Sequence, residues 1–354
     1  MSRFFSTTHK NLVPYVPGEQ LNDKKYIKLN TNESPYPPSD KVKKAVSEEV
    51  SRLMLYSDPD SKELVSALAK RYNLPEDCVV VTNGSDEILN FAFLAFCDST
   101  HPAIFPDLTY GFYKVFANLY NLPYTEIPLN KDFTVSPEDY MLNNATVFLA
   151  NPNAPTGIAL ELSEIEKIVK ANPDNVVIID EAYVDFGTES AVSLVNKYDN
   201  LLVTQTFSKS RSLAGARLGM GFASPELIKD INTLRYSTNP YNVNRMTMKA
   251  GVSAIEDDDY YMNNCKKIQL TRDYTASSLK ELGFFVTDSK ANFLFAESKR
   301  IKGSDLYVKL KEKGVLIRHF ESDRISNFNR ITIGTQEQME IFISKVLEIL
   351  EEEK

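Results

Sequence analysis

The sequence predicts an α/β protein with a large domain built on a mostly parallel sheet and a smaller α+β domain at the C-terminal end. Short apolar runs alternate with helical patterns between about residues 79 and 223, which is typical of parallel strands with helices on both faces. From about residue 251 a long, charged helical stretch precedes short strands and a last helix. A chain of 354 residues with 43% hydrophobic content can bury a sizeable core, divided between two lobes.

The first 38 residues predict an irregular arm rather than a folded layer. Pro14, Pro17, Pro35, Pro37 and Pro38 allow no long helix in this segment. We therefore expect an arm over residues 1–38, a large domain over 39–250 and a small domain over 251–354.

The elements of the two domains follow from the apolar patterns. For the large domain we expect, in order, helices at 39–53 and 61–72, a strand at 79–82, a helix from about 85, a strand at 103–105, a helix at 110–120, a strand at 146–150, a helix at 163–171, and strands at 176–179, 201–207 and 218–223. For the small domain we expect a helix at 260–282, strands at 284–286, 293–296 and 330–333, and a helix at 337–351.

Composition and charge exclude several classes of protein. The net charge of −8 and the lack of a basic run argue against a nucleic-acid surface. Three widely spaced cysteines, Cys78, Cys97 and Cys265, form no CxxC or Cys/His cluster, so neither a disulfide scaffold nor a zinc site is expected. The start of the chain lacks a signal-peptide core and no apolar run approaches membrane-spanning length. We expect a cytoplasmic protein that does not bind membranes.

Chemically suggestive side chains follow two neighbouring buried strands. Lys209 comes at the end of the run 201–208, and Asp180 and Tyr183 follow the run 176–179. Arg217 lies eight residues beyond the lysine. Because ligands of such sheets bind at the carboxyl ends of the strands, these residues are expected to meet there. Taken alone, Lys209 could be a surface lysine, Asp180 a cap of the next segment and Arg217 a structural arginine. Together, the lysine, the aspartate and the arginine suit pyridoxal 5'-phosphate, because its aldehyde, ring nitrogen and phosphate need these three groups.

A second pattern predicts where a phosphate would bind. Gly84 is followed by Ser85 and Asp86 at an expected helix start, where free N–H groups and the helix dipole attract an anion. Taken alone, the turn is more simply an ordinary helix cap. Combined with Ser208 and Arg217, it favours a phosphate site.

Three further features remain open at this point. Tyr110 could stack on a flat ring or be one of many core aromatics. The loop 151–157, with its Asn, Pro and Gly residues, could bring an amide to the cofactor but is also an ordinary turn composition. Arg318 and Arg330 could each clamp a carboxylate or phosphate, although a surface ion pair explains either one taken alone.

These motifs give the chain a resemblance to the fold-type-I pyridoxal-phosphate-dependent aminotransferases. The most specific segments are 180–183, 208–217 and 330–335, with 29–36, 56–59 and 106–111 also typical, so the resemblance covers nearly the whole chain. Within that family the chain is similar to the members that exchange an amino group between L-histidinol phosphate and 2-oxoglutarate in histidine biosynthesis.

The resemblance implies a role for each residue around the cofactor. Lys209 would bond to the aldehyde and then carry a proton, Asp180 would hold the ring nitrogen, and Tyr183 would tune the ring hydroxyl. Tyr110 would stack on the ring. The phosphate would be held by Ser85, Asp86, Thr206, Ser208 and Arg217.

The resemblance also implies partners and a substrate site. Tyr56 would reach the cofactor phosphate of a neighbouring subunit, which implies a homodimer. Arg330, assisted by Arg318, would bind the carboxylate or phosphate of the substrate, Tyr15 would enclose the imidazole, and Asn32 would contact the substrate.

One position departs from the family pattern. The family usually has an asparagine directly before Pro155, where its amide bonds the ring hydroxyl, and here that residue is Ala154. We expect Asn153 to take over this hydrogen bond.

Other functions remain as alternatives. An aromatic amino acid aminotransferase and a threonine-phosphate decarboxylase would share the Lys209 strand. A cofactor-binding sensor would need a DNA-binding segment, which is not found before the arm. An unrelated nucleotide-binding protein is disfavoured because neither GxGxxG after a strand nor GxxxxGK[ST] occurs.

Overall fold

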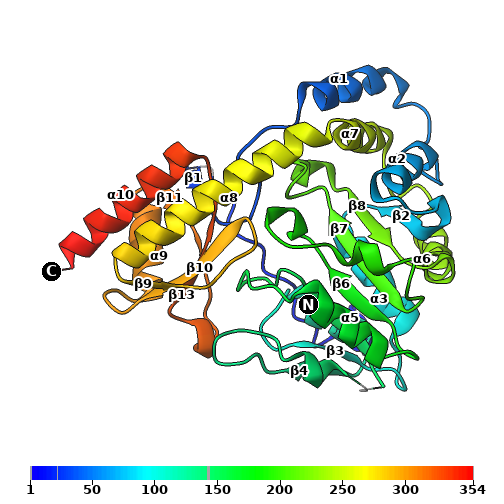
Figure 1. Ribbon diagram of the computed structural model, residues 1–354, viewed down its shortest axis with the longest axis horizontal. Helices are drawn as coiled ribbons and strands as arrows, with labels where there is room; N and C mark the ends of the chain where they lie inside the picture. Colours follow the sequence, from blue (N-terminus) through cyan, green and yellow to red (C-terminus); the bar gives the residue numbers. More distant parts are fainter. Residues whose placement is uncertain (1, 22, 142–143, 354) are drawn as a thin grey trace.

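The computed structural model describes residues 2–21, 23–141 and 144–353 and shows two lobes (Figure 1). The helices are α1 (Asp40–Glu49), α2 (Lys62–Tyr72), α3 (Ser85–Phe96), α4 (Phe112–Leu119), α5 (Leu162–Ala171), α6 (Pro225–Thr238), α7 (Arg245–Glu256), α8 (Asp258–Glu281), α9 (Gly303–Glu312) and α10 (Gln336–Glu352). The strands are β1 (Ile27–Lys28), β2 (Val79–Thr82), β3 (Ala103–Pro106), β4 (Tyr124–Ile127), β5 (Thr146–Ala150), β6 (Val177–Asp180), β7 (Leu201–Thr206), β8 (Gly219–Phe222), β9 (Phe284–Val286), β10 (Phe293–Ser298), β11 (Val315–Leu316), β12 (Arg318–His319) and β13 (Phe328–Thr332).

The large lobe is built on a seven-stranded sheet in the order β2-β8-β7-β6-β5-β3-β4. The strands β4, β3, β5, β6 and β7 are parallel to one another, and β8 is antiparallel to both of its neighbours. The predicted α/β class with a mostly parallel sheet is therefore confirmed. Parallel strands place their carboxyl ends at one edge, so Asp180 at the end of β6 lies beside Ala150 on β5 and Thr204 on β7.

Helices cover both faces of this sheet. Alternate residues of a strand point to opposite faces, and the core divides accordingly. Val147, Ile179 and Val203 pack in one cluster with α2, α5 and α7. Phe148, Ile178 and Leu202 pack in another with α3, α4 and α6. The strands are apolar on both sides, as strands buried between two helical layers must be.

The small lobe contains an antiparallel sheet in the order β12-β13-β10-β9, packed against α8, α9 and α10. Helix α8 runs from this sheet to α7 and links the lobes (Figure 1). Within the predicted arm, β1 pairs with β11, and Leu29 is buried in the small-lobe core. The boundaries proposed at residues 38 and 250 remain predictions.

Most predicted elements are present, with ends moved by a few residues. The helix expected over 39–53, for example, ends at Glu49. Helices α6, α7 and α9 and the short strands β1, β4, β11 and β12 were not predicted. The strand β4 was missed because its four residues are partly exposed and therefore carry only a weak apolar pattern.

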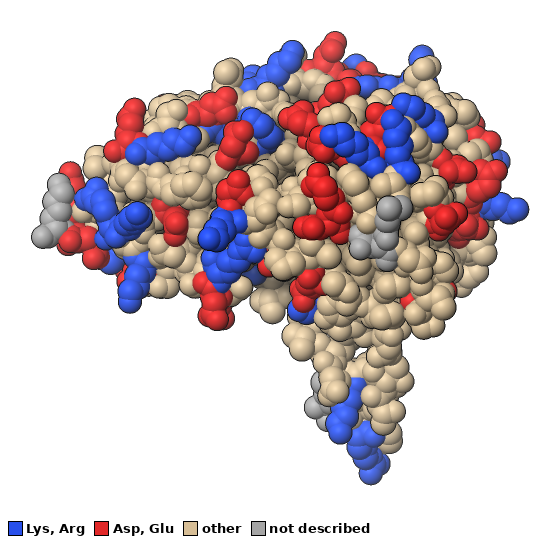
Figure 2. Space-filling view, turned by 60° about the horizontal axis from the view of Figure 1, so that its bottom comes forward, with Lys and Arg blue, Asp and Glu red and all other residues tan. Residues whose placement is uncertain are grey.

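Acidic and basic side chains are interspersed over the body of the molecule in the face that Figure 2 shows. Among the helices of the described residues, none is long and apolar enough to cross a membrane.

Candidate active site

A cavity of about 350 Å³ lies at the carboxyl ends of β5, β6 and β7 and gathers most of the predicted residues. Those that line it are Ser85, Asp86, Tyr110, Asp180, Tyr183, Thr206, Ser208, Lys209 and Arg217. Thr31, Glu33 and Ala154 line it as well. A larger groove of about 1080 Å³, lined by residues such as Asp185 and Lys290, contains none of the predicted site residues.

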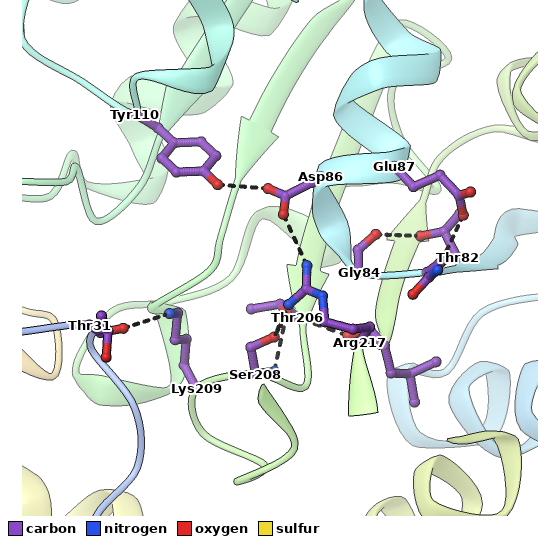
Figure 3. A network of polar contacts seen from close by, with 12 residues as sticks. Thr31, Thr82, Gly84, Asp86, Glu87, Tyr110, Thr206, Ser208, Lys209 and Arg217 are labelled. Atoms are coloured by element: carbon purple, nitrogen blue, oxygen red, sulfur yellow. Dashed lines mark hydrogen bonds and ion pairs between the residues drawn. The ribbon is translucent and has the colours of Figure 1, made fainter. Parts of the chain in front are cut away.

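Lys209 extends into the cavity from the turn after β7. Its Nζ lies 3.4 Å from the carbonyl oxygen of Thr31 (Figure 3). The same atom lies 5.8 Å from the centre of the Tyr183 ring. Burial and, to a smaller extent, the positive charge of Arg330 lower the pKa of the Lys209 amine to about 8. The neutral, nucleophilic form of this amine is therefore accessible near neutral pH.

Asp180 presents one unpaired oxygen at the end of β6. Its side chain is 4% exposed, and its Oδ2 accepts a hydrogen bond of 3.0 Å from the Tyr113 hydroxyl. Its Oδ1 is buried and has no hydrogen-bond partner among the described residues. Burial raises the pKa of this carboxyl to about 7, although the bond from Tyr113 acts in the opposite direction. A cationic N–H group in the cavity would satisfy Oδ1 and restore the charged form.

Tyr113 was not singled out from the sequence. It lies in the first turn of α4, three residues after Tyr110, which precedes the helix, and the two rings meet edge to face with centres 5.8 Å apart. A search for polar side chains close to Tyr110 in the predicted helix could have found it.

The turn from β2 to α3 forms a cradle with β8. Gly84 has a φ of +82°, which favours glycine, and its main chain passes close to Gly219 on β8. A Cβ atom on Gly219 would lie 2.4 Å from both the Gly84 carbonyl carbon and the Ser85 nitrogen. The start of α3 and the side chains of Ser208 and Arg217 lie around this turn.

Asp86 connects the cradle to Tyr110. Its Oδ1 accepts a hydrogen bond of 2.7 Å from the Tyr110 hydroxyl, and its Oδ2 lies 3.0 Å from Arg217 Nη2 (Figure 3). Ser208 N donates to Thr206 Oγ1 at 3.1 Å, which fixes the turn before Lys209. The side chain of Asp86 thus orients Arg217 and Tyr110.

The structure places the Asn153 side chain outside the cavity. Its Nδ2 donates to the carbonyl oxygen of Leu108 at 3.0 Å and to Thr156 Oγ1 at 3.2 Å, while its Oδ1 accepts from Thr109 Oγ1 at 2.7 Å. The amide is therefore fully used away from the cavity, and the neighbouring residue that lines the cavity is Ala154.

Asn32 is likewise not among the residues that line the cavity. The residue is 1% exposed, and its side chain bonds to Tyr183 and Thr332 rather than facing the cavity. Its neighbours Thr31 and Glu33 line the cavity instead.

Arg330 is a cation close to Lys209 with unused hydrogen-bonding capacity. Its Nη2 donates to the carbonyl oxygen of Asn30 at 3.1 Å, and its buried Nε has no partner among the described residues. No ion pair with an acidic side chain is found for it within the described chain. Burial lowers its pKa, and an anion would compensate this desolvated charge.

Arg318 and Tyr15 bring the arm to the same region. Arg318 donates to the carbonyl oxygens of Pro17 and Val16 at 3.4 and 3.3 Å. The Tyr15 ring stacks on Phe112 with centres 4.4 Å apart and lies 6.5 Å from Tyr110. Tyr56 lies elsewhere: it is 79% exposed and stacks on Tyr241.

Comparisons with known proteins agree with this arrangement. Residues 24–346 match the model of the family "Aminotransferase class I and II", and the chain belongs to this family. It therefore has the fold-type-I aminotransferase architecture and is an aminotransferase.

Within the family the chain is similar to particular proteins. It is 50% identical over 352 residues to histidinol-phosphate aminotransferase of Brachyspira hyodysenteriae, covering 99% of each chain. Among solved structures, histidinol-phosphate aminotransferase of Sinorhizobium meliloti in complex with pyridoxal-5'-phosphate matches with a TM-score of 0.91 and 21% identity over 99% of each chain. The L-threonine-O-3-phosphate decarboxylase of Porphyromonas gingivalis matches with a TM-score of 0.80 and 24% identity, over 92% of this chain and 99% of that one.

Proposed function

We propose that this protein is a pyridoxal-phosphate-dependent aminotransferase that moves an amino group between L-histidinol phosphate and 2-oxoglutarate, giving imidazole-acetol phosphate and L-glutamate in histidine biosynthesis. The observation that carries the proposal is that one cavity holds both a lysine amine of lowered pKa and an aspartate oxygen that has no hydrogen-bond partner among the described residues. The name shared by relatives up to 50% identical supports the choice of substrate.

The residues of the cavity fit the cofactor. Asp180 Oδ1 would accept a hydrogen bond from the protonated ring nitrogen, and Lys209 would bond to the aldehyde carbon. The cradle formed by Ser85, Asp86, Thr206, Ser208 and Arg217 would hold the phosphate, with Tyr110 against the ring. When bound, pyridoxal phosphate supplies an aldehyde that accepts the amino group and a ring that withdraws electrons from the adjacent carbon.

The chain's own groups then bind the substrate and move protons. Arg330, with a buried unpartnered Nε, would bind the phosphate of histidinol phosphate or the carboxylate of 2-oxoglutarate, with Arg318 assisting. The Lys209 amine would take the proton from the substrate carbon, because its lowered pKa of about 8 makes the neutral form accessible near neutral pH. Tyr15, stacked on Phe112, would close over the imidazole.

We also propose a homodimer in which Tyr56 reaches the partner's cofactor phosphate. The exposure of this tyrosine, together with the neighbouring exposed side chains of Val50, Leu53, Met54 and Leu55, supports an interface here. As an enzyme that exchanges amino groups between small metabolites, the protein is proposed to act in the cytoplasm, which cell fractionation would test.

The proposed substrate is tested by following the absorbance of cofactor-loaded protein mixed with one amino donor and no acceptor. L-histidinol phosphate should convert the bound cofactor to its amine form faster than L-phenylalanine does. Faster conversion by phenylalanine would identify an aromatic aminotransferase instead. Release of CO₂ from threonine phosphate would identify a decarboxylase.

A further inference from the structure

Asn32 is a buried residue whose polar groups all bond within the protein. It lies in the segment between β1 and α1 and has a left-handed backbone with a φ of +56°. Its main-chain N–H donates to Thr332 Oγ1 at 2.9 Å, and its carbonyl oxygen accepts from Asn292 Nδ2 at 3.0 Å. Its side chain bonds to Tyr183 and Thr332, both at 3.0 Å. These contacts tie Tyr183 of the large lobe to residues beside β10 and on β13 of the small lobe.

The orientation of the Asn32 amide follows from the donors around it. The main-chain N–H of Asn32 can only donate, so Thr332 Oγ1 accepts that bond. The single proton of Thr332 then remains for Asn32 Oδ1. With Oδ1 turned to Thr332, the NH₂ group of the amide faces Tyr183. The network therefore selects one of the two possible amide orientations.

This orientation determines the role of the Tyr183 hydroxyl. Because Asn32 Nδ2 donates to it, the phenol oxygen is an acceptor in that bond and its own proton is not used there. No other hydrogen bond of this hydroxyl is found among the described residues, and Tyr183 lines the cavity. The phenol proton is therefore available to an acceptor inside the cavity.

We propose that Asn32 is a positioning residue that makes Tyr183 a hydrogen-bond donor toward the ring hydroxyl of the cofactor, and that Thr332 holds Asn32 in the required orientation. The inference rests on the proposed cofactor. It also accounts for the alanine at residue 154, since the amides of Asn153 and Asn151 are bonded elsewhere and Tyr183 is left as the polar group for that hydroxyl.

The test compares variants of full-length protein by two measurements other than turnover: the dissociation constant of pyridoxal phosphate and the pH midpoint of the absorbance change of the bound cofactor. A proton donated to the ring hydroxyl stabilises negative charge on that oxygen and lowers the midpoint, so its loss raises the midpoint. Asn32→Gly removes the amide and suits the positive φ. We expect it to raise the midpoint by about half to one pH unit and to weaken cofactor binding roughly fivefold.

Asn32→Asp keeps the size of the side chain but replaces the N–H donor with an acceptor. It should draw the Tyr183 proton away from the cavity and raise the midpoint further than Asn32→Gly does. Thr332→Val leaves the amide free to turn and should shift the midpoint in the same direction, whereas the matched control Thr332→Ser keeps the hydroxyl and should behave as wild type.

A double variant separates positioning from a general structural effect. In a Tyr183→Phe background, Asn32→Gly should produce no additional shift, because there is no phenol to orient. An equal shift in both backgrounds, or unchanged midpoints in Asn32→Gly and Asn32→Asp, would overturn the inference. A wild-type protein that binds no pyridoxal phosphate would instead contradict the proposed function itself.

Discussion

Three ionisable side chains of the active site have properties that come from burial. Burial lowers the pKa of Lys209 and of Arg330 and raises that of Asp180. Each shift favours the neutral form of the group, so a charged ligand in the cavity would change the protonation equilibrium of each group. The cavity is thus suited to a ligand that carries both a cationic ring and anionic substituents.

The lowered pKa of Lys209 predicts how fast the cofactor-free protein reacts with pyridoxal phosphate. The reactive form is the neutral amine, whose fraction increases as the pH rises through about 8. We expect the rate of incorporation, followed by absorbance, to reach half its maximum near that pH. Lys209→Ala should show no incorporation and no measurable transamination. A midpoint near the ordinary lysine value would show that the amine is well solvated.

Asp180 predicts an effect on stability that changes sign with the cofactor. Its folded-state pKa of about 7 lies above its ordinary value of 3.8, so the stability that this group contributes is full below the ordinary value and is lost as the pH rises through about 7. In the cofactor-free protein, the free energy of unfolding of Asp180→Asn relative to that of wild type should therefore increase by a few kcal/mol as the pH rises from 4 to 7.5.

The measurement for Asp180 is the thermal midpoint of both proteins across this pH range. With pyridoxal phosphate bound, the ring nitrogen supplies the positive partner, and the order of stability should reverse. Equal pH dependence in wild type and variant would contradict the burial of Asp180.

At the scale of elements, the site depends on one reversed strand. Strand β8 runs antiparallel between β2 and β7 and brings Gly219 against the turn that starts α3. The same strand follows Arg217, whose backbone is left-handed with a φ of +54°. The position of β8 thus sets both the main-chain cradle and the guanidinium beside it.

Gly219→Ala tests this close approach. The new Cβ would meet main-chain atoms 2.4 Å away, which cannot move aside as a flexible side chain could. We expect a loss of about 1–3 kcal/mol in stability and weaker binding of pyridoxal phosphate, measured by chemical denaturation and by cofactor titration. Gly215→Ala is the stability control, because a Cβ there has no atom within 4 Å. Equal stability of the two variants would show that the main chain at Gly84 and Ser85 can move away from β8 without loss of stability.

At the scale of the whole molecule, the proposed homodimer predicts that the exposed Tyr56 completes the active site of the partner subunit. A mixed dimer of Lys209→Ala and Tyr56→Ala subunits would contain one site with both residues intact if Tyr56 acts across the interface. Each parent homodimer should be strongly impaired. After exchange of subunits in an equal mixture, activity should recover toward about a quarter of that of wild type, because half of the dimers are mixed and each of these has one intact site of two. No recovery would mean that Tyr56 acts within its own subunit, and a fully active Tyr56→Ala homodimer would mean that Tyr56 does not contribute to the site.

The sequence by itself determined the features that depend on neighbours along the chain. The buried runs ending near Asp180 and Lys209 predicted both the parallel sheet and the edge where the site forms, because strand burial and strand ends have a local apolar signature. The glycine turn before Ser85 was visible for the same reason. The predicted site residues on these segments do line one cavity.

Only the tertiary structure decided which way the remaining polar groups turn. The sequence predicts that Asn153 faces the cofactor, but its amide bonds to Leu108. It predicts that Asn32 contacts the substrate, but its amide bonds to Tyr183. The partners of Asn32 on the small lobe lie 260 and 300 residues away along the chain. An amide has both donors and acceptors, so its direction is set by whichever partners the fold brings to it, and no local pattern records them.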